Sequence, residues 1–127
     1  MLTWTHDLQF DARSAQTALV IDGRGVAGPS PVEALALAVA GCMAIDVVDI
    51  VTKGRHPLQG LTVTLTAERA AEPPRRFISV ALHFNLRGSV PAAAVERALQ
   101  LSRDKYCSVW QTVRQDIPLT TTYEVHP

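Results

Sequence analysis

The stretch GPSPVEALALAVAGCMAI, residues 28–45, carries the clearest helix start in the chain. Ser30 can cap a helix, and Pro31 suits the first helical position. Glu33 can reach back to Ser30 and complete a capping box. This pattern predicts that a helix begins at Ser30 or Pro31.

The body of this predicted helix is apolar on every side. Residues 34–45 include no charged side chain, and the Cys42 thiol is their only polar group. A helix of that composition is normally surrounded by other elements of structure. We expect it to run to about Lys53, where Gly54 stops it, and to form the centre of the fold.

Alternating apolar and polar side chains predict half-buried strands on both sides of the helix. The alternating stretches are residues 2–10, 15–21, 61–66, 78–86 and 119–125, with turn residues at 11–14 and 72–75. A second helix is predicted to open at Pro91 and to end near Tyr106. Residues 107–114 are expected to add a short helical piece.

The predicted order of elements is therefore β-β-α-β-β-α-β in a single domain, residues 1–127. Hairpin connections imply antiparallel pairing, and strands and helices do not alternate one by one. We predict an α+β fold in which antiparallel strands pack on a long buried helix.

Composition and motifs exclude several classes of function. Lys plus Arg equals Asp plus Glu at 12 each, so no net charge favours nucleic acid or an anionic membrane. No signal peptide is indicated at the N-terminus, and the apolar run of residues 34–45 is shorter than the roughly 20 residues that span a bilayer. No phosphate loop, dinucleotide fingerprint or metal-ligand spacing occurs. We expect a cytoplasmic protein without a metal or a cofactor.

Two cysteines are the residues most suited to chemistry. Cys42 lies in the apolar helix, and Cys107 follows the polar segment 102–106 near the end of the second helix, where a thiol can be reached. Cys42 is either a buried small hydrophobe or a nucleophilic thiolate, which needs a nearby cation. Arg13 and Arg24, in loops around the second strand, are the candidates for that cation. Two thiols this far apart cannot be paired from sequence alone.

The residues around the two cysteines resemble a known family. The segments GPSPVE (28–33), AGC (40–42) and KYC (105–107) look like those of the osmotically inducible protein C / organic hydroperoxide resistance (OsmC/Ohr) family. The predicted order of elements is similar as well, so the resemblance covers nearly the whole chain.

The resemblance implies an intertwined homodimer that acts in oxidative-stress defence as a thiol-dependent peroxidase. Its substrate would be an organic hydroperoxide, and a dithiol reductant would restore the enzyme. On the matching positions, Cys42 would attack the peroxide and become a sulfenic acid, and Cys107 would resolve it to a disulfide. The two cysteines are then expected within disulfide reach. The family's activating arginine would correspond to Arg13, with Arg24 as the reserve.

One position departs from the family pattern. Hydroperoxide-resistance members have a glutamate ten residues before the first cysteine, where it holds the arginine, and this chain has Val32 there. Glu33 is one residue later and is better explained as a helix cap, although it is an alternative site residue. Asp46 lies one turn after Cys42 on the same helix face. Either Asp46 holds the arginine instead, which we predict, or it merely begins the solvated end of the helix.

Two other functions compete with the peroxidase hypothesis. The interface of the expected homodimer could bind an apolar ligand without catalysis. The cysteine pair could also report oxidation as a redox sensor without turnover. Because only a reactive thiol needs a cation, an arginine near Cys42 would favour the peroxidase or the sensor over the binding protein.

Overall fold

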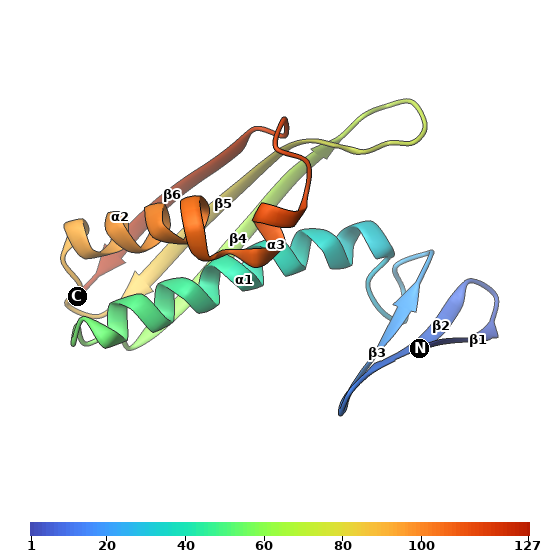
Figure 1. The fold of residues 1–127 in the computed structure, drawn as a ribbon, viewed down its shortest axis with the longest axis horizontal. Helices are drawn as coiled ribbons and strands as arrows, with labels where there is room; N and C mark the ends of the chain where they lie inside the picture. Colours follow the sequence, from blue (N-terminus) through green and yellow to red (C-terminus); the bar gives the residue numbers. More distant parts are fainter. The chain divides into compact units, whose positions relative to one another are not determined.

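The computed structural model describes all 127 residues and has an α+β fold (Figure 1). The elements in chain order are β1 (Leu2–His6), β2 (Gln9–Ser14), β3 (Thr17–Asp22), α1 (Pro31–Lys53), β4 (Gly60–Arg69), β5 (Phe77–Arg87), α2 (Ala92–Leu101), the π-helical turn η1 (Ser102–Tyr106), α3 (Ser108–Thr112) and β6 (Leu119–His126). The predicted α+β class is confirmed. The chain divides into two compact parts, residues 1–37 and 38–127, with the boundary inside α1. That residues 1–127 form one domain stays a prediction.

The first part contains a three-stranded antiparallel sheet in the order β1-β2-β3. We expected two strands, with a turn at residues 11–14, and this was wrong. The chain turns earlier, at Asp7 (φ 47°), and again at Ala15 (φ 50°). The first turn leaves Trp4 paired with Phe10 across the hairpin. The alternation therefore continues through the turn without a break, which made two strands look like one.

The start of α1 is as the sequence predicted. The Glu33 backbone amide donates a hydrogen bond to the Ser30 hydroxyl (3.2 Å), which in turn donates to the Glu33 carboxylate (3.1 Å). Each side chain thus serves the first turn of the helix. Ser30 caps the helix as predicted, but the Glu33 carboxylate accepts from the Ser30 hydroxyl and not from its backbone amide, so the capping box is only half formed.

The second part contains the sheet β4-β5-β6, which is mixed rather than antiparallel as expected. β4 and β5 form an antiparallel hairpin, whereas β6 pairs with β5 in parallel. The chain between them passes through α2 and α3, and a crossover of this kind returns a strand in the same direction. Figure 1 shows α2 and the later part of α1 on one face of this sheet.

The core lies between that sheet face and the helices. Fully buried side chains come from α1, from alternate positions of β5 and from α2; they include Met43, Val47, Val51, Leu82, Phe84, Leu86, Val95 and Ala98. The polar side chain of Ser102 is buried with them.

In the single chain, α1 is less covered than its composition predicted. It is long and apolar enough to cross a membrane by length and hydropathy, and only 33% of its most apolar window is buried. Core helices of water-soluble proteins satisfy the same test of length and hydropathy. Leu37, Ile45 and Val48 are among its exposed side chains. A large apolar surface of α1 is therefore left uncovered within one chain.

Candidate functional site: a pair of thiols

Cys107 is held by the backbone that surrounds it. Its amide donates a hydrogen bond to the carbonyl of Ser102 (2.8 Å), which closes the π-helical turn η1. Its sulfur accepts a hydrogen bond from the amide of Trp110 (3.3 Å) and so caps α3. The side chain is fully buried. The expectation of a readily reached thiol at this position was wrong, because Cys107 is buried where it caps the start of α3.

Cys42 is the more accessible of the two thiols. It lies on α1 with intermediate exposure, and its sulfur is 3.9 Å from the hydroxyl oxygen of Ser108. The Cys107 thiol is close enough to Cys42 for each thiol to affect the pKa of the other. The chain therefore brings together two cysteines that are 65 positions apart in sequence.

The surroundings of the two thiols shift their acidities in opposite directions. Burial raises the pKa of Cys42, but hydrogen bonds from the Val109 amide, the Cys107 thiol and the Ser108 hydroxyl outweigh it, so this pKa lies below its ordinary value of 9.0. Burial raises the pKa of Cys107 to about 11. The partly exposed thiol is thus the stronger nucleophile, and the buried one stays protonated.

Sequence reasoning missed the donors to Cys42. It assumed that only an arginine could favour the thiolate, because Cys42 lies far from the start of its own helix. The structure supplies donors from the start of α3, through Ser108 and Val109. The only signal in the sequence was that both residues directly follow Cys107.

The other predicted site residues, Asp46, Arg13 and Arg24, lie in three different elements of the chain. Asp46, one turn after Cys42, accepts a hydrogen bond from the Ser102 hydroxyl (2.7 Å). Arg13 is in β2, opposite Ala18 of β3, and Arg24 is in the following loop, where its amide donates to Asp22. The roles of Arg13, Arg24 and Asp46 in activating Cys42 stay predictions.

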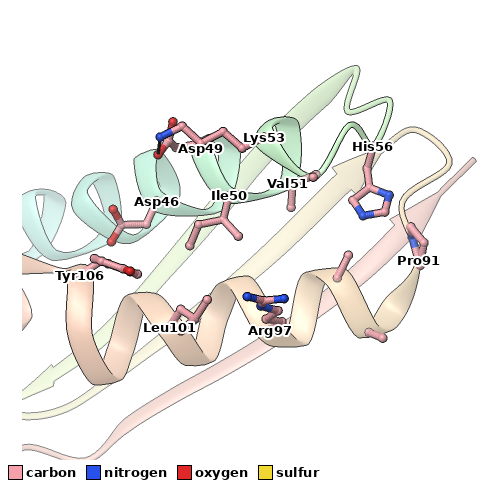
Figure 2. Close-up of a pocket in the computed structure, with 13 residues that line it drawn as sticks. Asp46, Asp49, Ile50, Val51, Lys53, His56, Pro91, Arg97, Leu101 and Tyr106 are labelled. Atoms are coloured by element: carbon pink, nitrogen blue, oxygen red, sulfur yellow. Dashed lines mark hydrogen bonds and ion pairs between the residues drawn. The ribbon is translucent and has the colours of Figure 1, made fainter.

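A groove of about 860 Å³ has Asp46, one turn after Cys42, and Tyr106, the residue before Cys107, in its lining, although neither cysteine lines it. It runs between the C-terminal half of α1 and α2, and Figure 2 shows Asp46 and Tyr106 at one end and His56 at the other. Ile50 and Leu101 are among the apolar side chains that line it. Its volume is in the range of sites for small organic molecules.

The two pKa shifts predict selective modification. At pH 8 we expect iodoacetamide to alkylate Cys42 and to leave Cys107 almost untouched, because at a pKa of about 11 roughly one Cys107 thiol in a thousand is ionised. Peptide mass spectrometry of the folded protein would locate the label. In denaturant both thiols should react at similar rates. Preferential labelling of Cys107 in the folded protein would reverse the assignment of roles.

Comparison with known proteins supports a family assignment. A family model described as OsmC-like protein matches residues 22–122. Protein YhfA of Escherichia coli strain K12 is 42% identical over 125 residues, which cover 96% of this chain and 93% of that protein. A hypothetical protein from Aquifex aeolicus VF5 has a crystal structure that matches with a TM-score of 0.90 at 25% identity, over 98% of this chain and 92% of that one. The organic hydroperoxide resistance protein OhrB of Bacillus subtilis shares the fold, with a TM-score of 0.65 at 14% identity over 98% of this chain and 96% of that one.

The family model covers most of the chain, and the relative from Escherichia coli is similar over nearly its full length. Organic hydroperoxide resistance proteins are among the structures that share this fold. The chain belongs to the OsmC-like protein family.

Proposed function

We propose that the protein is a thiol-dependent peroxidase that reduces organic hydroperoxides in the cytoplasm. The observation that carries this proposal is the proximity of two thiols whose pKa values are shifted in opposite directions. Cys42 has a lowered pKa and partial access to solvent, whereas Cys107 is buried and its pKa is raised to about 11. The first step needs a thiolate, and the second needs a protected thiol next to it.

The proposed reaction has two steps within the protein. The Cys42 thiolate attacks the terminal oxygen of the hydroperoxide, the O–O bond breaks, and the alkoxide takes a proton and leaves as an alcohol. The Cys107 thiol gives up its proton as its sulfur attacks the sulfur of the Cys42 sulfenic acid. The S–O bond breaks, the disulfide forms, and the displaced hydroxide leaves with that proton as water. A dithiol reductant supplies the two electrons that restore both thiols. The apolar side chains of the adjacent groove favour a bulky organic peroxide over hydrogen peroxide.

The test is consumption of an alkyl hydroperoxide under a dithiol reductant, followed together with the titration of free thiols. We expect turnover, and without reductant a loss of two thiols per chain. No consumption, with both thiols left free, would contradict the proposal.

Activation by an arginine is a further part of the proposal. Because a cation near a thiol lowers its pKa by about one to three units, Arg13→Ala is expected to slow the reaction of Cys42 with peroxide at neutral pH roughly tenfold without unfolding the protein. Arg24→Ala is the comparison, and a larger loss there would transfer the role to Arg24. The measurement is the stopped-flow rate of Cys42 oxidation.

Asp46→Asn separates two possible effects of this carboxylate. If Asp46 holds the arginine, the variant should lose part of the rate. The charge of Asp46 on its own raises the pKa of Cys42, so without that role the variant should react faster. A faster reaction would therefore contradict the predicted link to Arg13.

The groove beside the thiols favours one alternative function, the binding of an apolar ligand without catalysis. It has the volume for such a ligand, and Ile50, Val51 and Leu101 give it an apolar part beside the charged side chains Asp46, Asp49, Lys53 and Arg97. Saturable binding of a fluorescent fatty acid, in a protein that consumes no hydroperoxide, would support this function instead. Oxidation of the cysteine pair without turnover would support a redox sensor.

A further inference from the structure

Ser102 is bonded to both cysteine-bearing segments. Its hydroxyl donates a hydrogen bond to the carboxylate of Asp46 (2.7 Å), which lies one turn after Cys42 on α1. Its carbonyl accepts a hydrogen bond from the amide of Cys107 (2.8 Å). The residue is fully buried. The side chain and the carbonyl of Ser102 thus connect α1, which carries Cys42, to the backbone of Cys107.

The bond between Ser102 and Cys107 exists because the helix widens at this point. In an α-helix the carbonyl of residue 102 would accept from residue 106, whereas in η1 it accepts from Cys107. Such π-helical turns are rare and often occur at functional sites. The position of Cys107 therefore depends directly on where Ser102 is held.

The bond between Ser102 and Asp46 fixes that point against α1. A hydrogen bond to an ionised acceptor is stronger than one between neutral groups and is more restrictive in geometry. If it is lost, η1 keeps its internal bond to Cys107 but is no longer bonded to α1 through Ser102.

We propose that Ser102 is a positioning residue that, through Asp46, holds Cys107 at the distance from Cys42 that disulfide formation requires. The proposal rests on the two-cysteine function above for its biological meaning, although the geometry concerns the thiol pair itself. Its side chain is bonded to Asp46 and its carbonyl to the Cys107 amide, so the proposal concerns the position of Cys107 in the resolving step. Any effect of Asp46 on the pKa of Cys42 is measured separately, from the rate of Cys42 oxidation by peroxide.

The test measures the effective concentration of the two thiols in a redox buffer of reduced and oxidised glutathione. In this equilibrium one oxidised glutathione takes up the two thiol hydrogens and gives two reduced molecules, and mass spectrometry after acid trapping reports the protein disulfide. We expect Ser102→Ala to lower the effective concentration roughly tenfold, which corresponds to about 1.4 kcal/mol. Asp46→Ala should lower it as well, and the double variant should lose no more than the larger single loss.

Tyr123→Phe is the matched control. It removes a bond of the same kind and length, from the Tyr123 hydroxyl to the Glu96 carboxylate (2.7 Å), which joins β6 to α2 away from the cysteines. The control should keep the effective concentration of the wild type, even if its melting temperature falls. Equal losses in Tyr123→Phe and Ser102→Ala would overturn the proposal, because they would reflect general loosening of the fold.

The failures of the two proposals can be told apart. If Ser102→Ala keeps the wild-type effective concentration while the wild type consumes hydroperoxide, the positioning role is wrong and the peroxidase function stands. If the wild type consumes no hydroperoxide but Ser102→Ala loses disulfide formation, the positioning role stands and the peroxidase function is wrong. In an active enzyme, Ser102→Ala should also convert more Cys42 to sulfinic acid per turnover, because slower resolution leaves the sulfenic acid exposed to peroxide for longer.

Discussion

Cys42→Ser is expected to abolish hydroperoxide reduction, with a loss on the order of 10³-fold or more, because the reaction has no nucleophile without this sulfur. Cys107→Ser is expected to behave differently. It should reduce about one equivalent of hydroperoxide per chain and then stop, because Cys42 reaches the sulfenic acid but has no thiol with which to form the disulfide. Under excess peroxide, Cys42 should then be oxidised further to sulfinic acid.

The measurement is hydroperoxide consumption without an added thiol, which could itself reduce the sulfenic acid, with the oxidation state of each cysteine read by mass spectrometry. Equal loss of the first equivalent in both variants would contradict the division of roles. It would mean that Cys107 takes part in the attack, which its burial and its raised pKa argue against.

Ile45→Asp is expected to prevent the formation of a homodimer. Leu37, Gly41, Ile45 and Val48 recur on α1 with helical spacing, and Ile45 is 69% exposed in the single chain. A Cβ at Gly41 would meet no atom within 4 Å, so nothing within the chain requires glycine there. Close approach of a second helix would explain both the glycine and the exposed apolar side chains, and we propose that this face is the core of a homodimer.

A carboxylate in such an interface loses its hydration without gaining a partner. We expect the dissociation constant to rise by roughly 10³-fold or more, equivalent to about 4 kcal/mol, with a fall in melting temperature. Analytical ultracentrifugation of wild type, Ile45→Asp and Ile78→Asp provides the test. Ile78, which is 41% exposed on β5, is the matched control and should leave the dimer intact. A wild-type protein that sediments as a folded monomer at micromolar concentration would contradict the homodimer.

Local patterns predicted the elements of the fold, and their failures have physical causes. The helix start at Ser30 depends on residues three positions apart, so sequence alone could place it. The turn at Asp7 could not be predicted, because the alternation of apolar and polar residues continues without a break from β1 into β2. The parallel pairing of β6 also escaped, since it depends on the path of residues 88–118 and not on any pattern within the strand.

The candidate site was predictable in its residues but not in their environments. The resemblance identified Cys42 and Cys107, yet their relative burial is the reverse of what the neighbouring side chains indicated. Cys107 is buried where its sulfur caps the start of α3, and the hydrogen bonds to Cys42 come from residues beyond position 106. Such contacts between distant segments carry no local signal in the sequence.

The parallel pairing of β5 with β6 affects when, during folding, the pKa values of the two thiols diverge. Cys107 lies in the crossover between these two strands, so the chain must close that long loop before β6 can dock, and non-local closure of this kind is slow compared with hairpin formation. Until then both cysteines have the acidity of ordinary thiols. During synthesis, the nucleophilic character of Cys42 should therefore arise among the last events of folding, after the C-terminal strand has left the ribosome. In an emerging chain Cys42 would still lack its lowered pKa, whereas Cys107 would not yet have the burial that raises its own.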